Sequence, residues 1–258
     1  MFRLALVLIA LSTLAACANV GEGAGPQAAI AGARPVDREA RQRISRADML
    51  TQMAFWAGEY QAFANDLEAA QKFSEALRQG GRADRAAEIA GEALGRFPND
   101  PALLHTYGLA QIAARHPQEA LRPLALLAQA EPRNWRARSA LGAALDQLGR
   151  FDEARRAYGE ALALAPNDAG VLTNLGMSHL LAGEPEAAEP ILRQAIALPN
   201  APAEARQNLA IALALQGRFE EAELLVRIDL PPAQAAANIA YLRGLLSDPR
   251  RWGDLNPG

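Results

Sequence analysis

From Leu67 onward, small and apolar residues recur along the chain with a period of 34 residues. Five consecutive blocks of this length align without gaps, and the same places in each block are small, apolar, Gly or Pro. This pattern is typical of a repeated pair of helices, each pair packing on the next. It predicts five helix pairs over residues 67–236, in blocks that begin at Leu67, Pro101, Trp135, Ala169 and Ala203.

Small residues occupy two places of the block where helices are expected to approach closely. Place 20 is Ala in all five blocks, because a larger side chain there would overpack the contact between the two helices of a pair. Place 8 is Gly in three blocks and Ser or Ala in the other two. The residues at place 20 are Ala86, Ala120, Ala154, Ala188 and Ala222, and those at place 8 are Ser74, Gly108, Gly142, Gly176 and Ala210.

Gly, Pro and Asp mark where the predicted helices begin and end. Gly at place 15 is expected to end the first helix, since a left-handed backbone costs least at Gly. Pro at place 32 closes the second helix, and the Asn-Asp pairs that follow can cap the next one. These residues are Gly81, Gly149, Gly183 and Gly217, then Pro98, Pro132 and Pro166, with Asn99-Asp100 and Asn167-Asp168.

The third block carries the most complete signature and resembles the tetratricopeptide repeat. The resemblance rests on Leu141-Gly142, Gly149, Phe151, Ala154, Tyr158, Ala161 and Pro166. It implies an all-α fold, a right-handed solenoid of helix–turn–helix repeats with capping helices at both ends.

Both ends of the repeated region depart from the pattern, as capping elements do. Residues 37–66 lack the repeat signature and are expected to form N-terminal capping helices over the first repeat. At the other end Asp229 replaces a small residue at place 27, and Pro231-Pro232 shorten the second helix. A further apolar helix is predicted from about Ala233 to Leu246, so residues 237–258 supply a C-terminal capping helix and a tail.

Composition and charge narrow the classes of function. Ala accounts for 59 of the 258 residues, which favours closely packed helices over a sheet. A net charge of −3 without a basic stripe argues against a nucleic-acid partner. One Cys and the separate His105, His116 and His179 provide neither a zinc site nor a nucleophilic motif. We therefore expect no enzyme activity, no metal, no cofactor and no small-molecule substrate, and we expect His179 to be a packing residue.

The N-terminus has the form of a bacterial lipoprotein signal. A short positive start and an apolar stretch precede Leu14-Ala15-Ala16-Cys17, in which small residues lead to the single Cys of the chain. Residues 1–16 are expected to be a signal peptide, with Cys17 the lipidated first residue and 17–36 a Gly-rich tether. The alternative is an ordinary secretory signal with an incidental Cys. Because Ala18 follows rather than Asp, the expected location is the outer membrane, facing the periplasm.

The first helices of stacked repeats line a concave surface, which is the expected binding face. In the first and third blocks the residues expected to face it are polar, and they include Ser139 and Asp146. In the fourth and fifth blocks they are apolar around two amides. The candidate partner-binding residues are Asn174, Met177, Gln207, Asn208 and Ile211, since amides can bond an extended peptide backbone beside adaptable apolar side chains. The alternative is that these residues belong to the repeat consensus and the core between repeats.

The C-terminal half resembles the TadD family of tight-adherence (Flp) pilus lipoproteins. The resemblance is carried by residues 174–178, 206–210, 215–219 and 238–243. It implies an adaptor at the outer membrane that assists pilus assembly, as a pilotin for the secretin would. Its partners would be the secretin or other assembly components. The alternative is a different periplasmic scaffold lipoprotein, for example one that recruits cell-wall hydrolases.

Overall fold

The computed structural model describes residues 37–247, and every regular element in that range is an α-helix. None of the described helices is long and apolar enough to cross a bilayer. The signal peptide, Cys17 and the tether predicted for residues 1–36 lie outside the described residues. Among the described residues, α2 (Arg38–Ile44) and α3 (Met49–Ala62) precede the repeats, and α14 (Pro232–Ser247) follows them.

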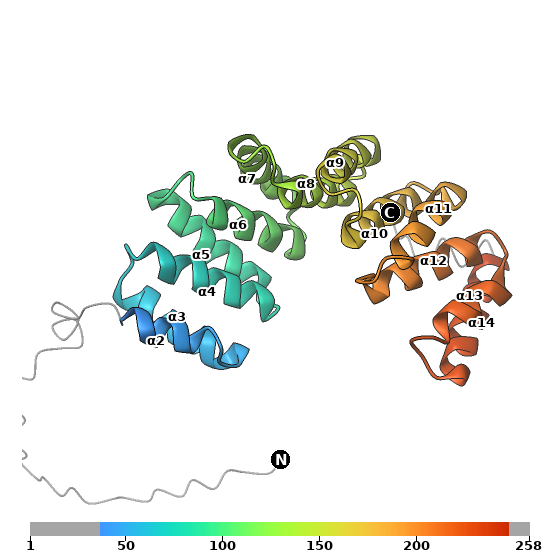
Figure 1. Ribbon diagram of the computed structural model, residues 1–258, viewed down its shortest axis with the longest axis horizontal. Coiled ribbons are helices and arrows are strands. Elements are labelled where there is room, and N and C mark those ends of the chain that lie inside the picture. The colour runs from blue at the N-terminus through green and yellow to red at the C-terminus, as the bar shows by residue number, and fades with distance from the viewer. Residues whose placement is uncertain (1–36, 248–258) are drawn as a thin grey trace, which may run out of the picture. The chain divides into compact units, whose positions relative to one another are not determined.

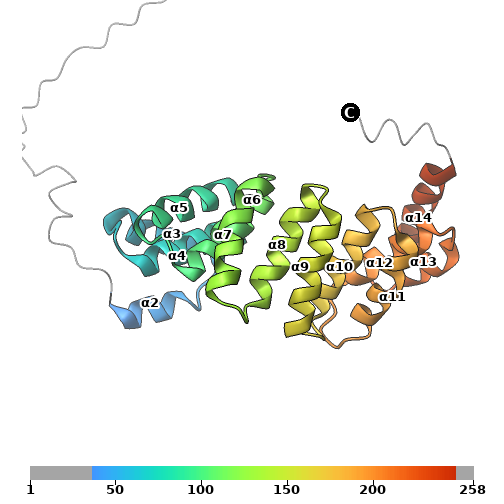
Figure 2. The same cartoon turned by 90° about the horizontal axis from the view of Figure 1, so that it is seen from above.

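Between these ends the helices form five successive pairs (Figure 1). The first helices of the pairs begin 34 residues apart and contact one another in order. Each second helix packs between two first helices, except that α13 packs between α12 and α14 (Figure 2). This arrangement confirms the predicted fold class. The pairs are α4 (Leu67–Gln79) with α5 (Ala83–Arg96), α6 (Pro101–Ala113) with α7 (Pro117–Ala130), α8 (Trp135–Gln147) with α9 (Phe151–Leu164), α10 (Ala169–Leu181) with α11 (Pro185–Ile196), and α12 (Ala203–Leu215) with α13 (Phe219–Val226).

Side-chain caps start four of the first helices. In each case the side chain before the helix accepts a hydrogen bond from the backbone N–H three residues later, which satisfies a donor that has no partner inside the helix. Asp100 and Asp168 do this as predicted, whereas α12 begins after Pro202 without a side-chain cap. The four capping residues are Asp66, Asp100, Asn134 and Asp168.

Left-handed residues follow the first helices, as the Gly pattern predicts. Gly81, Gly149, Gly183 and Gly217 all have φ between 71° and 78°. The second repeat has Arg115 at the same place, with φ of 64°. A side chain costs about 1–2 kcal/mol in this conformation, so Arg115 is a strained position in an otherwise regular turn.

Replacing Arg115 with Gly is therefore expected to stabilise the protein by about 0.5–1 kcal/mol. The gain is smaller than the strain because Gly also increases the entropy of the unfolded chain. Urea denaturation measures the difference in the free energy of unfolding between the variant and the unmodified protein. Gly149→Ala is the matched control, and it should lower the stability by a similar amount; a loss of stability in both variants would contradict the assignment of strain to Arg115.

In the second, third and fourth repeats, Gly at place 8 is matched by a large residue at place 24 of the same repeat. A Cβ atom added to Gly108 would lie 2.5 Å from Cγ of Leu124, too close for any real contact. The same holds for Gly142 against the ring of Tyr158 and for Gly176 against Leu192, at 2.7 and 2.5 Å. Each Gly is therefore required by the side chain opposite it.

In the first and fifth repeats, other residue types form this contact. They have Ser74 and Ala210 at place 8, and their place-24 residues are the smaller Ala90 and Val226. In the fifth repeat the larger residue at place 8 is thus offset by a smaller one at place 24, as close packing demands, while in the first repeat both residues are small. The five alanines at place 20 are fully buried, in agreement with the close approach predicted from the sequence.

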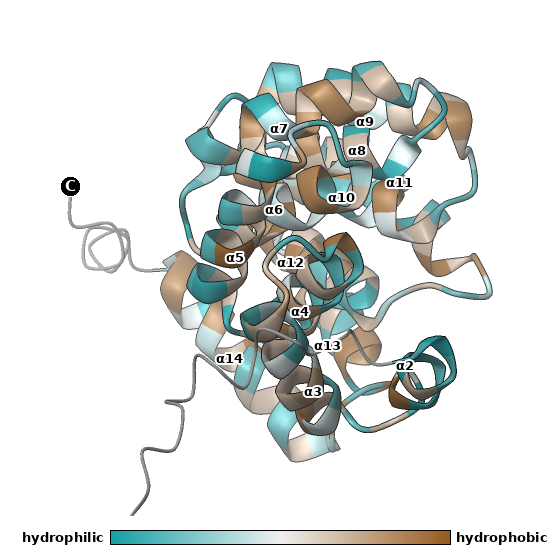
Figure 3. Cartoon of the chain, turned by 90° about the vertical axis from the view of Figure 1, so that its left-hand side faces the viewer, coloured by the Kyte–Doolittle hydropathy of each residue, from teal (hydrophilic) through white to brown (hydrophobic). Residues whose placement is uncertain are grey.

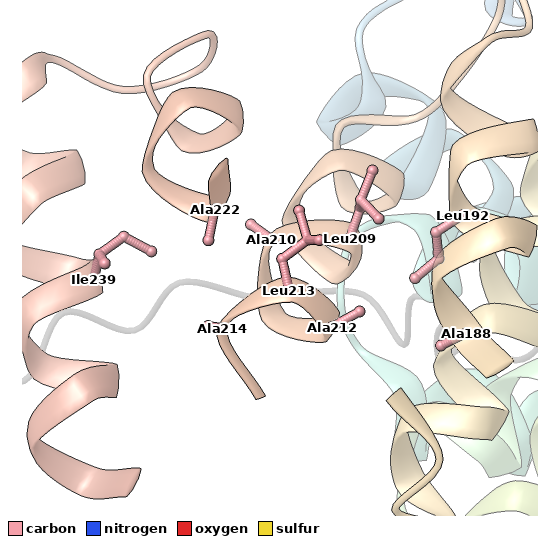
Figure 4. Packing of buried hydrophobic residues seen from close by; sticks show 9 residues of the cluster. All are labelled: Ala188, Leu192, Leu209, Ala210, Ala212, Leu213, Ala214, Ala222 and Ile239. Atoms are coloured by element: carbon pink, nitrogen blue, oxygen red, sulfur yellow. The ribbon is translucent and has the colours of Figure 1, made fainter. Parts of the chain in front are cut away.

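The apolar faces of the helices form a series of local clusters. The other faces are polar, so single helices carry both hydrophobic (brown) and hydrophilic (teal) residues in Figure 3. At the C-terminal end, Leu192 of α11 and Ile239 of α14 point toward α12 from opposite sides (Figure 4). The helix α14 therefore covers the last repeat as a cap.

At the N-terminal end, α3 packs against α4 and buries Trp56 with 2% exposure. The guanidinium of Arg41, on α2, lies 5.4 Å from the centre of the Trp56 ring. It also forms ion pairs with Glu59 at 2.6 Å, with Glu68 at 2.7 Å and with Asp66. One buried cation thus joins α2 to α3 and to the start of the first repeat.

Candidate functional site

The first helices form a face, here called the first-helix face, that is hollowed between α6, α8 and α10. Two adjoining hollows of about 620 and 330 Å³ share His105, Trp135 and Arg136. The smaller one extends along Ser139 to Asn174. Together they make a groove across three successive repeats, which we call the Trp135 groove.

Arg136 contributes one positive charge to this groove. Its guanidinium lies 4.3 Å from the centre of the Trp135 ring, where the electron-rich face of the ring attracts the cation. Arg136 forms no ion pair with the other described residues, although many of the neighbouring arginines do. It is therefore available to a carboxylate or a carbonyl oxygen of a ligand.

His105 lies beside Arg136 and is neutral near pH 7. Burial, together with the nearby charge of Arg78, lowers the pKa of His105 below its ordinary value of 6.5. A neutral imidazole has one donor and one acceptor, which suits hydrogen bonds to a peptide backbone. Arg133, Glu131 and Asp168 also line the Trp135 groove, so its chemistry is that of polar binding with charges of both signs.

A second groove lies at the C-terminal end of the same face, between α12, α13 and α14. Its volume is about 420 Å³ and it is mainly apolar. We call it the C-terminal groove; its lining includes Gln207, Ile211, Leu230, Ile239, Tyr241 and Leu242.

Comparison with known proteins places this architecture in a family. Tetratricopeptide-repeat profiles match residues 136–201 and 173–235. The solved structure of MamA from AMB-1 is 30% identical, with a TM-score of 0.50 over 61% of this chain and 95% of that chain. The chain belongs to the tetratricopeptide-repeat family.

Other solved structures agree with that assignment. MamA from MSR-1 is 28% identical, with a TM-score of 0.52 over 62% of this chain and 91% of that chain. TTC0263, a thermophilic tetratricopeptide-repeat protein of Thermus thermophilus, is 24% identical and shares the fold, with a TM-score of 0.59 over 68% of this chain and 97% of that chain. A comparison with curated proteins gave no match. Tetratricopeptide repeats are protein–protein interaction scaffolds, and the family is typically non-catalytic.

The five candidate residues predicted from sequence do not form one site in this tetratricopeptide array. Asn174 is exposed in the Trp135 groove, whereas Gln207 and Ile211 lie together in the C-terminal groove. Met177 is half-buried and lines neither groove. Asn208 was expected on the binding face, but it is buried with 7% exposure because α12 is packed between α10 and α14.

Asp146 also differs from expectation, because it lies inside the repeat array and not on the binding face. Its carboxylate accepts hydrogen bonds from the hydroxyls of Tyr158 at 2.9 Å and Ser178 at 2.6 Å. Burial raises the pKa of Asp146, although the two hydrogen bonds oppose that shift. The network joins α8, α9 and α10, so Asp146 has a structural role that its spacing in the sequence did not reveal.

The histidines show no catalytic arrangement in the described part of the chain. His179 was expected to pack in the core, but its Nδ1 lies 2.7 Å from the carboxylate of Glu184, at the turn into α11. Glu184 also pairs with Arg155 at 3.1 Å. Within residues 37–247, no cluster of three or more His, Cys, Asp or Glu side chains is arranged to hold a metal ion.

Proposed function

We propose that this tetratricopeptide-repeat protein is a lipid-anchored adaptor of tight-adherence pilus assembly at the outer membrane, on its periplasmic side. The solenoid would bind the secretin or another assembly component, in the manner of a pilotin. The sequence resemblance to the TadD family and the lipoprotein signal ending at Cys17 support this proposal. Anchoring would concentrate the partner at the membrane and so strengthen its capture without further contacts.

The observation that carries the binding proposal is the Trp135 groove. It offers an unpaired guanidinium stacked on an aromatic ring, a neutral imidazole and the exposed amide of Asn174. These groups suit an extended protein segment, whose backbone takes the hydrogen bonds while an acidic side chain or a carbonyl oxygen meets Arg136.

The test is affinity purification of the full chain from its own cells, with the partners identified by mass spectrometry. Recovery of secretin and pilus-assembly proteins is expected, and Arg136→Glu should reduce it at least tenfold. Arg122→Glu is the matched control. This substitution changes the charge by the same amount, but Arg122 is exposed on the second helix α7, outside the groove. Recovery of cell-wall hydrolases instead would overturn the pilus assignment, and equal loss in both variants would overturn the role of the groove.

Replacing Cys17 with Ser tests the anchor. The thiol is the group that the lipid modifies, so Cys17→Ser is expected to move the protein from the membrane fraction to the soluble periplasmic fraction. The solenoid begins well after this residue, so its melting temperature should not change. Persistent membrane binding of the variant, in cells without pilus components, would show that the lipid is not the anchor.

A further inference from the structure

In three repeats the space at the end of the second helix is filled by a buried apolar trio. Each trio consists of the residue at place 4, in the first helix of the repeat, the residue at place 27, in its second helix, and the residue at place 3 of the next repeat. All of these residues are at most 4% exposed. The trios are Ala70, Ala93 and Leu103 after the first repeat, Leu104, Leu127 and Ala137 after the second, and Leu172, Ala195 and Ala205 after the fourth.

The fifth repeat replaces this apolar contact with an ion pair. Its trio is Arg206, Asp229 and Ile239. The guanidinium of Arg206 forms a bidentate pair with Asp229, at 2.9 and 2.6 Å, and both side chains remain partly exposed. An ion pair that keeps access to water cannot close the junction as Leu and Ala do.

The second helix of this repeat is also short. Helix α13 ends at Val226 after 8 residues, whereas α9 has 14 and α11 has 12. The missing residues correspond to more than one turn of helix. The C-terminal groove, of about 420 Å³, is the open form of a junction that the first, second and fourth repeats fill with apolar side chains, whereas the third repeat has Arg138 at place 4.

Exposed apolar side chains are frequent on the elements that border this opening, and two of them, Ile211 and Tyr241, line it. Nine large apolar side chains of the described residues are exposed, and five of them lie on α12, α13, α14 or the connection before α14. Clustered apolar exposure of this kind is typical of a docking surface. The five are Ile211, Leu215, Leu224, Ile228 and Tyr241.

The charges near the C-terminal groove cancel locally. Asp229 is neutralised by Arg206, whose hydrogen bonds lower the pKa of the carboxyl group. The other cations close by are also paired, Arg227 with Glu223 at 2.6 Å and Arg243 with Glu220 at 3.0 Å. A matching ligand surface is therefore uncharged and apolar, unlike the segment that suits Arg136.

We propose that the C-terminal groove binds the apolar face of a short helix from a protein partner. This helix takes the place that the end of the second helix has in the complete repeats, beside Ile211 and Tyr241. The inference rests on the proposed role as a protein-binding adaptor, but it does not need the partner to be a pilus component.

The experiment places a photoreactive phenylalanine analogue at Gln207, on the exposed rim of the groove, in the full chain and in its own cells. Mass spectrometry then identifies the cross-linked peptide. Gln118, exposed on α7, is the matched control position. The expected product is one protein segment with apolar residues three and four positions apart, cross-linked from Gln207 and not from Gln118.

Three further variants separate docking from folding. Ile211→Asp places a charge in the groove and should reduce the cross-link at least tenfold, whereas Leu164→Asp, at a similarly exposed position on α9, should not. The double variant R206L/D229A copies Leu172 and Ala195 of the fourth repeat, so it should keep the melting temperature and also lose the cross-link.

Several results would overturn the proposal. These are a cross-link to residues 248–258 of the same chain, a cross-link to a second copy, an equal yield from Gln118, or a yield that Ile211→Asp does not change. The identity of the cross-linked protein tests the pilus assignment separately. An apolar helix from a protein unrelated to pili would support the groove and refute that assignment.

Discussion

Replacing Arg41 with Met is expected to lower the free energy of unfolding of the N-terminal cap by about 3–5 kcal/mol, as loss of one partner of a buried ion pair does. The change leaves the largely buried carboxylate of Asp66, whose side chain is 13% exposed, without its counter-charge, and it removes the cation from the ring of Trp56. Hydrogen exchange of the amides of α2 and α3, together with urea denaturation, measures the effect.

The matched control is Arg43→Met, on the same helix. Arg43 pairs with Glu39 at the surface, with both side chains at least 70% exposed, so its loss should cost less than about 0.5 kcal/mol. If both variants lost the same stability, the buried cluster would not be what holds α2 in place.

Acid should weaken the same contact in the unmodified protein. Burial opposes ionisation of Asp66, but the hydrogen bonds from Arg41 and from the backbone of Ala69, together with the charge of Arg41, outweigh it and lower the pKa of the carboxyl group below 3.8. A carboxyl group with a lowered folded pKa contributes its full stabilisation above the unfolded value and loses it as the pH falls through the folded one. The difference between Arg41→Met and the unmodified protein should therefore shrink only below about pH 4.

The second large effect is expected from Gly108→Ala, which should destabilise the domain by about 1–3 kcal/mol. The added methyl group would meet Cγ of Leu124 at 2.5 Å, and this atom is not at the flexible end of its side chain. The overpacking outweighs the better helix propensity of Ala, which is worth about 1 kcal/mol. Thermal and urea denaturation measure the loss.

A double-mutant cycle shows whether the size match is the cause. Leu124→Val alone should cost about 1 kcal/mol, while the double variant G108A/L124V reproduces the pair Ala210 and Val226 of the fifth repeat. The double variant should be at least about 1 kcal/mol more stable than the sum of the single changes predicts. Simple additivity would mean that the two residues are not matched to each other.

The repeat architecture was accessible from sequence because its determinants are local and periodic. Asp100, Asp168 and the Gly residues at place 15 act within a few residues of their own position, so that their spacing specifies the start or the end of a helix. The alanines at place 20 lie at the contact between the two helices of a pair, which recurs in every repeat. The periodic pattern was therefore sufficient to predict the fold.

The functional surface depends on contacts that do not recur. Tyr158 and Ser178 reach Asp146 from 12 and 32 residues away, and only their positions in space show that this acid is buried. Asn174 and Asn208 occupy the same place of the block, yet one is exposed and the other buried. The sequence pattern treats such positions as equivalent, whereas the neighbouring helices make them different.

The size match between places 8 and 24 also determines what can be exchanged between repeats. Because both members of each matched pair lie within one repeat, a transplanted or duplicated repeat brings its own complementary contact with it. A transplanted single helix does not: α4 carries Ser74, which evolved opposite Ala90 and would meet Leu124 if it replaced α6. The unit of inheritance and of design in this solenoid is thus the helix pair, and recombination within a pair creates steric conflicts that recombination between pairs avoids.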